Sequence, residues 1–247
     1  MSIIAGELIC YQSANMPEDD ATTSGGAINT AGKVDLTDLT ANDRVSVQSD
    51  GADTRTVTIT GRLASGAIDS EALVLNGVTW VDGAKTFERI LKVVTTSSGT
   101  RTVTVAKYAA AAHTPTLCTI ETNFTSVRRL FYDAASEASG TTRYEKIFWK
   151  NTNASLTLNT AILKLTADPA TKLTTAVALA KDDSVSVANR KTQPAGLTWV
   201  DDNVSMAVPG NTLEAASAIG LWLCLTLGAS DPAFKNTFTT QLSGTTV

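Results

Sequence analysis

The stretch Arg55-Thr-Val-Thr-Ile-Thr60 alternates hydroxyl-bearing and β-branched aliphatic side chains. Two further stretches, Arg101-Thr-Val-Thr-Val105 and Asp183-Ser-Val-Ser-Val187, repeat this pattern. A period of two places apolar side chains on one face of a strand and hydroxyls on the other, and Val, Ile and Thr suit a pleated surface. The sequence therefore predicts an all-β fold made of half-buried antiparallel sheets.

The composition favours a scaffold over catalytic chemistry. Of the 247 residues 39 are Thr and one is His, so acid–base groups are scarce. Hydrophobic residues make up 43%, enough for real cores in one large or two smaller domains, while 18% are charged, against about a quarter in an average protein. Net charge is −4, and basic residues stand singly apart from Arg128-Arg129. This distribution argues against a nucleic-acid groove, which concentrates Lys and Arg on one face.

The cysteines and the apolar segments indicate the cellular compartment in which the chain folds. Cys10, Cys118 and Cys224 are odd in number and far apart, and with one His a zinc set would need all three of them. We expect free, mostly buried thiols in a reducing cytosol. Met1–Glu7 lacks the basic start of a secretory signal, and the apolar run 218–227 is shorter than the roughly 20 residues of a membrane helix. A soluble protein made in the cytoplasm is expected.

Strand and turn signals predict two antiparallel β-sandwich or jelly-roll-like domains. We predict an extended N-terminal arm at 1–32, a first sandwich at 33–110, a connector at 111–142 and a second sandwich at 143–247. The strands predicted for the first sandwich are 44–48, 55–62, 70–75, 86–95 and 100–107. Those of the second are 144–150, 155–165, 174–179, 184–188, 197–200, 204–208, 218–227 and 237–242. Ser49-Asp-Gly-Ala-Asp53 has the chemistry of a hairpin turn between the first two strands.

Two other segments carry distinct predictions. The polar loop of the arm, 13–26, can bury little and is expected to become ordered on a partner. In the connector, Val127, Leu130 and Phe131 fall at helical spacing, and residues 134–138 could continue a short helix that ends at Gly140.

One hexapeptide occurs twice. Gly77-Val-Thr-Trp-Val-Asp82 returns as Gly196-Leu-Thr-Trp-Val-Asp201, near half the chain length away. Both copies precede a loop and an apolar strand, which is compatible with two sandwiches of related plan. A common strand end with an Asp-initiated turn is the simpler explanation of this repeat.

A search for catalytic and metal-binding patterns favours a non-enzymatic protein without cofactor or metal. His113 lies beside an alanine run and a proline, where a flexible joint is expected, and no Gly-x-Ser-x-Gly or complete phosphate loop is present. The acidic groups 18–20, 182–183 and 201–202 are interpreted as surface turns, although calcium loops or a glycosidase carboxylate pair leave no decisive signature.

The tryptophans Trp149 and Trp222 lie in strands with apolar neighbours on both faces, as core or subunit-interface anchors do. The run 219–227 should be central in a sheet or covered, because an exposed apolar edge invites aggregation.

Three stretches resemble virion structural proteins of tailed bacteriophages. They are the N-terminal segment 4–28 with Tyr11-Gln-Ser-Ala-Asn-Met-Pro17 and Gly25-Gly-Ala-Ile28, the threonine-rich block 52–93, and Thr142-Arg-Tyr-Glu-Lys-Ile-Phe-Trp-Lys-Asn151. Together they span about half of the chain.

The resemblance implies a structural part of a phage particle, most directly a capsid decoration (cement) protein that docks on the assembled head. Neck or tail subunits, and a virion-borne glycan-binding module, are the alternatives. The expected partners are other virion proteins and further copies of this chain, without nucleic acid or membrane. The candidate assembly residues are Tyr11, Met16, Pro17, Ile28, Trp149 and Trp222.

Overall fold

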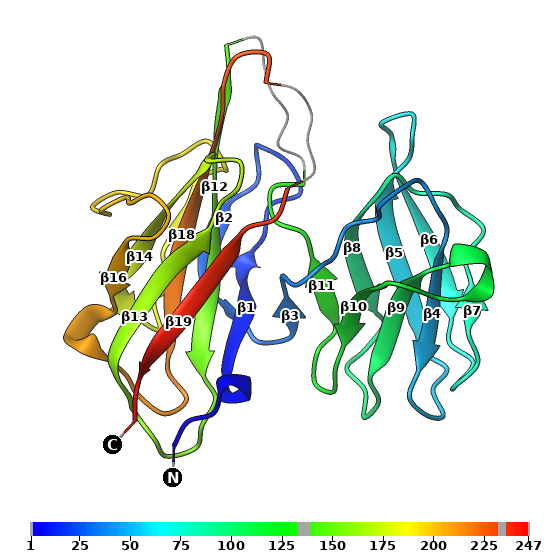
Figure 1. Cartoon of the computed structure of the whole chain (residues 1–247), viewed down its shortest axis with the longest axis horizontal. Coiled ribbons are helices and arrows are strands. Elements are labelled where there is room, and N and C mark those ends of the chain that lie inside the picture. Colours follow the sequence, from blue (N-terminus) through cyan, green and yellow to red (C-terminus); the bar gives the residue numbers. More distant parts are fainter. Residues whose placement is uncertain (1, 133–138, 232–235, 247) are drawn as a thin grey trace. The chain divides into compact units, whose positions relative to one another are not determined.

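The computed structural model describes residues 2–132, 139–231 and 236–246, and in these ranges the chain is all-β (Figure 1). Its elements separate into two compact units. Unit 1 combines residues 1–29 with 133–247, and unit 2 is the continuous segment 30–132. Unit 2 is thus inserted into the sequence of unit 1.

Unit 2 is a sandwich of two antiparallel-dominated sheets. The first sheet has the order β10-β9-β4-β7, with β4 Val45–Ser49, β7 Val81–Asp82, β9 Val103–Lys107 and β10 Thr116–Ile120. The second has the order β3-β11-β8-β5-β6, with β3 Gly32–Lys33, β5 Thr56–Arg62, β6 Ile68–Val74, β8 Arg89–Thr95 and β11 Ser126–Arg128. A short 3-10 turn, η2, spans Ala109–Ala111.

The period-two prediction is confirmed in unit 2. Along β5, Val57 and Ile59 are fully buried while the intervening threonines are half-buried, and β9 buries Val103 and Val105 in the same way. These side chains form the core between the two sheets. Burying each such aliphatic side chain contributes about 1.5–3 kcal/mol.

Unit 1 has a larger sheet and a smaller one. The larger has the order β14-β18-β12-β1-β2-β15, with β1 Leu8–Asn15, β2 Ser24–Asn29, β12 Thr141–Asn151, β14 Leu173–Lys181, β15 Ser186–Val187 and β18 Ala218–Leu227. The smaller is built on β13 Leu158–Ala167, which pairs with β16 Ser205–Ala207, β17 Thr212–Leu213 and β19 Thr239–Thr245. Two 3-10 turns, η1 Ala5–Glu7 and η3 Pro209–Asn211, complete the unit.

The predicted N-terminal arm is wrong. Strand β1 lies inside the larger sheet, between β12 and β2, with Tyr11 opposite Phe148. Backbone groups of an interior strand are paired on both sides, and this places residues 1–29 in the fold of unit 1. Their partner strand lies far away in the sequence, where a local pattern cannot reveal it.

The predicted connector at 111–142 is also wrong. Its first part supplies β10 and β11, which complete the two sheets of unit 2 and bury Leu117, Ile120 and Val127. Val127 pairs with Val93 in a strand register, so its spacing from Leu130 does not mark a helix. Residues 134–138 of the predicted helix lie outside the described residues.

Two smaller predictions also differ from the structure. Segment 49–53 is not a hairpin turn: β4 pairs with β9 and β7, whereas β5 pairs with β6 and β8, so this turn carries the chain from one sheet to the other. Of the strand predicted at 184–188, β15 retains two residues at a sheet edge, and Val185 is exposed. The apolar run 218–227, by contrast, forms β18 in the interior of its sheet, as predicted.

The repeated hexapeptide occupies equivalent places in the two units. Val81 pairs with Val47 of β4, and Val200 forms a bridge with Thr175 of β14. Strands β4 and β14 are in turn paired with β9 and β18. In unit 2 the chain next forms β8 in the other sheet and then returns to the first sheet as β9. In unit 1 it likewise forms β16 and β17 in the other sheet and then returns as β18. The two sandwiches therefore share this part of their plan.

Candidate functional site

The six candidate assembly residues all lie in unit 1, in environments that differ from an exposed arm. Tyr11 is buried in β1, and Trp222 is 1% exposed in β18. Trp149 is half-buried, and its Nε1 donates to Thr240 Oγ1 at 3.3 Å, across to the smaller sheet. Thus Trp222 is a core residue, while Trp149 joins the two layers. The others lie on or just after β1 and β2: Met16 and Ile28 are half-buried, and Pro17 is buried.

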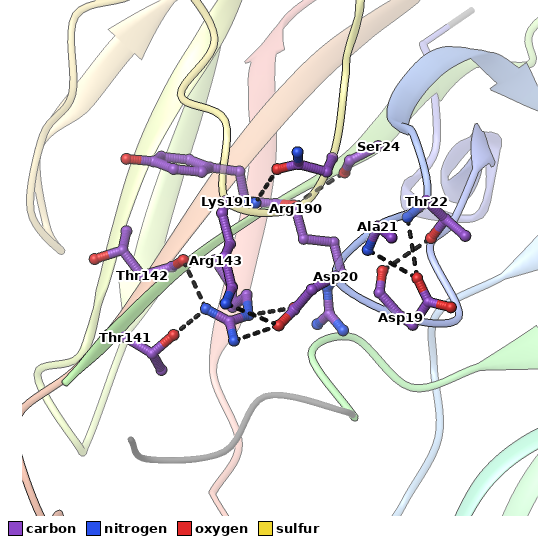
Figure 2. Close-up of polar contacts among 12 residues, drawn as sticks. Asp19, Asp20, Ala21, Thr22, Ser24, Thr141, Thr142, Arg143, Arg190 and Lys191 are labelled. Carbon is purple, nitrogen blue, oxygen red and sulfur yellow. Dashed lines mark hydrogen bonds and ion pairs between the residues drawn. The ribbon is translucent and has the colours of Figure 1, made fainter. Parts of the chain in front are cut away.

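The polar loop after β1 is fixed by an arginine from β12 (Figure 2). Arg143 forms an ion pair with the Asp20 carboxylate, in which Nε lies 2.5 Å from Oδ1 and Nη2 lies 2.6 Å from Oδ2. Lys191 Nζ approaches the same carboxylate at 3.3 Å. The charge-assisted hydrogen bond from Nη2 to Oδ2 is the strong, directional part of this ion pair. Asp19 stabilises the turn itself by accepting from the backbone N–H of Ala21 at 2.8 Å.

A second ion pair lies entirely inside unit 1. Glu145 Oε1 and Arg190 Nη2 are 2.9 Å apart, and both side chains are 0% exposed. The backbone reinforces this contact, because Tyr144 N–H donates to the Arg190 carbonyl at 2.7 Å. These bonds hold the segment after β15 against β12.

The third buried charge, Lys146, contacts the next loop of unit 1. Its Nζ bonds to Asp183 Oδ1 and donates to the carbonyls of Gly26 at 3.2 Å and Val185 at 3.3 Å. The ammonium also lies over the rings of Phe148 and Trp222, 4.6 Å and 5.4 Å from their centroids. Burial lowers the pKa of Lys146, and the bond to Asp183 partly opposes that effect.

In unit 2 an ion-paired carboxylate likewise fixes the loop before β4. The Asp38 carboxylate bridges two arginines, Arg89 Nε at 3.0 Å and Arg129 Nη2 at 3.2 Å. Arg129 Nε also donates to the Ile90 carbonyl at 3.0 Å. Burial lowers the pKa of Arg129 to about 10, which still leaves it charged at neutral pH.

The single histidine is part of an aromatic cluster in unit 2. The His113 ring stacks on Trp80 at 4.4 Å between centroids and meets Tyr108 edge-on at 6.2 Å. Its Nε2 lies 2.9 Å from Asp82 Oδ1, which also accepts from Ser46 Oγ at 2.7 Å. The Ser46 bond is the main reason that the pKa of Asp82 lies below its ordinary value, with a smaller contribution from His113.

This cluster differs from a nucleophilic catalytic site. Ser46 donates to Asp82 rather than to His113, so the serine–base contact that activates a nucleophile is not made. The arrangement instead fastens the segment around His113 to the edge strand β7. The predicted flexible joint at His113 is therefore an ordered contact.

Other site predictions can be compared with the described ranges. Within them no three His, Cys, Asp or Glu side chains gather in a way that could hold a metal ion. The three cysteines are free thiols. The part of the chain that the structure describes contains no helix with the length and hydropathy of a membrane span. No protein-family model, curated protein or solved structure matches the chain.

Sequence reasoning missed the buried charges. The sequence predicts surface turns at Asp20 and Asp183, whereas each carboxylate is the anion for a buried cation of β12. One signal points to them: Glu145-Lys146 lies within a strand with apolar residues on both faces, and two adjacent charges there cannot both face water. Their partners lie in loops, where the sequence pattern gives no indication of pairing.

Proposed function

We propose that this chain is a non-enzymatic structural subunit of a tailed-phage particle, most directly a decoration protein that docks on the assembled head. The observation that carries this proposal is the outer face of strands β5 and β6. Thr58 lies opposite Ala72, and Thr60 opposite Ser70, with a 2.9 Å hydroxyl contact between the latter two. At the centre of this two-strand face the outward side chains are hydroxyls and a methyl group, and Lys92 of β8 lies opposite Thr60 at its border.

Exposed aliphatic side chains extend this face. Val74 is opposite Thr56 and Ile68 is opposite Arg62, and both aliphatic side chains are more than half exposed, at 58% and 52%. A sheet face of hydroxyls and aliphatics loses little solvation free energy when a partner covers it, because few charges must be dehydrated. The buried ion pairs meanwhile keep the loops of each unit fixed, which favours a rigid building block.

Counting copies in purified particles tests the proposal. Quantitative mass spectrometry of particles from the phage that encodes the chain should find it at a level comparable to the major capsid protein. A much smaller copy number would favour a neck or tail subunit. Its absence from particles would overturn the proposal.

Thr58→Arg tests the docking face itself. The new charge should abolish binding of the purified protein to undecorated heads while leaving the fold unchanged. Thr104→Arg is the matched control, because Thr104 is a half-buried strand threonine of the other sheet of unit 2. Equal loss of binding in both variants would exclude this face as the contact.

A virion-borne glycan-binding module is the second candidate. The half-buried Trp80 with the exposed carboxylate of Asp82 is the observation that favours it, since sugars stack on aromatic rings and bond to carboxylates. Glycan-array binding that Trp80→Ala removes would support this candidate.

A further inference from the structure

The side chain of Lys146 is enclosed on the face of β12 that points away from the smaller sheet. Trp149, an odd-numbered neighbour, reaches Thr240 of that sheet, so the even-numbered Lys146 and Phe148 point to the opposite side. Glycine makes the space for Lys146: a Cβ at Gly220 would lie 2.5 Å from its Cε. Lys146 is 0% exposed.

The amine of Lys146 is in contact with a carboxylate group. Asp183, whose side chain is 8% exposed, contacts Lys146 Nζ through Oδ1. The same Oδ1 accepts from the Val185 backbone N–H at 3.1 Å. An amine and a carboxyl group are thus held in contact in an enclosure roofed by the rings of Phe148 and Trp222.

We propose that Lys146 and Asp183 condense into an intramolecular amide bond after unit 1 folds. One proton moves from the ammonium to the carboxylate, leaving a neutral amine and a carboxylic acid. Nζ then bonds to Asp183 Cγ, the Cγ–Oδ1 bond breaks, and Oδ1 leaves as water with that proton and a second one from Nζ. No oxidant, cofactor or other reactant is needed.

The surrounding contacts favour each step. The carbonyls of Gly26 and Val185 each accept one N–H of Lys146, so the proton that is transferred is the one facing Asp183 and the lone pair appears on that side. The Val185 N–H donates to the same Oδ1 at 3.1 Å and so orients the oxygen that leaves as water.

The environment favours both the nucleophile and the product. Desolvation lowers the pKa of Lys146, which raises the fraction of neutral amine, as in other lysines that act as nucleophiles. Aromatic rings and the glycine-lined backbone exclude the water that would hydrolyse the bond. The crosslink would join β12 to the loop after β14 and restrict the unfolded chain.

Intact-mass spectrometry of the purified, folded chain tests this proposal. The expected mass is lower than the sequence mass by one water molecule. Trypsin should then yield a branched product in which peptide 144–150, uncut at Lys146, is joined to peptide 182–190. Fragment ions must place the junction at Asp183 rather than Asp182.

Two controls make the result unambiguous. Lys146→Arg keeps the positive charge but has no nucleophilic amine, and it should retain the full mass. Within the same molecule, Lys85 and Asp69 form a 2.6 Å pair that is 40% and 39% exposed, and these two residues should stay unlinked. Wild-type chain recovered from insoluble inclusion bodies and kept in denaturant, which has never folded, should also keep its full mass.

Two results would overturn the proposal. A folded wild-type chain at full sequence mass after prolonged incubation would make the pair a simple ion pair. A water loss confined to peptide 182–190 would indicate a cyclic imide at the aspartate instead. Neither outcome depends on the role of the chain in a virion.

Discussion

Breaking the Glu145–Arg190 pair should strongly destabilise unit 1. Both side chains are 0% exposed and their charged atoms are 2.9 Å apart. Removing one partner leaves the other charge buried without its counter-ion, which typically costs about 3–5 kcal/mol. We expect Glu145→Leu and Arg190→Met each to lower the free energy of unfolding of unit 1 by about that amount.

The double variant should behave differently. When both charges are replaced by apolar side chains, neither group must be dehydrated, and stability is expected within about 1 kcal/mol of the wild type or above it. The coupling free energy from the double-mutant cycle should therefore be close in magnitude to the sum of the two single-variant losses.

Tryptophan fluorescence during urea unfolding gives the required measurement. Trp149, Trp199 and Trp222 belong to unit 1 and Trp80 to unit 2, so a Trp80→Phe background reports on unit 1 alone. This separation matters because a chain of two units need not unfold in one step.

The exposed pair Lys181–Glu214 is the control within unit 1, at 2.7 Å with Glu214 47% exposed. Solvent screening limits such a pair to about 0–1 kcal/mol, so Glu214→Ala should change little. Losses in the buried single variants that are no larger than in this control would refute the reasoning.

Three further outcomes are expected. Trp222→Ala should cost unit 1 about 3–5 kcal/mol, as for a large buried aromatic, and a loss below about 1 kcal/mol would contradict its burial. A chain without residues 12–27 should lose the urea transition of unit 1, because half of β1 and most of β2 are removed, whereas the isolated segment 30–132 should fold by circular dichroism. The hydrogen bond from Arg55 lowers the pKa of Asp53, so its contribution is present above the ordinary carboxyl pKa of about 4 and is lost as the pH falls through the lowered value. Thermal melts of unit 2 between neutral and acid pH should therefore fall less steeply for Asp53→Asn than for the wild type.

The sequence reveals the strands whose pattern is local. Threonine–valine alternation in β5 and β9 follows directly from one buried and one open face, and the apolar run of β18 follows from its interior position. In each case the residue types of the strand themselves indicate which of its faces are buried. The predicted bounds of β5 and β18 therefore agree with the structure to within one residue, whereas β9 begins at Val103, three residues after its predicted start.

Long-range pairing accounts for the predictions that were wrong. The polar loop before Gly25-Gly26 has the composition of a flexible arm, yet the glycines serve packing: a Cβ on Gly25 would lie 2.5 Å from the Trp222 ring. Asp20 likewise has the composition of a turn until Arg143 of β12 is placed beside it. Nothing near these residues in the sequence indicates either contact.

The insertion of unit 2 has a consequence for how unit 1 can form. Pairing of β1 with β12 requires a very long loop to close, and such closure costs conformational entropy. Strand β3, just after the start of unit 2, runs parallel to β11, close to its end, with Ser126 opposite Gly32. Folding of unit 2 therefore brings its two ends together and shortens the effective loop between β2 and β12. Because unit 2 is continuous in sequence and its contacts are more local, we infer that it folds first and prepares the pairing of β1 with β12.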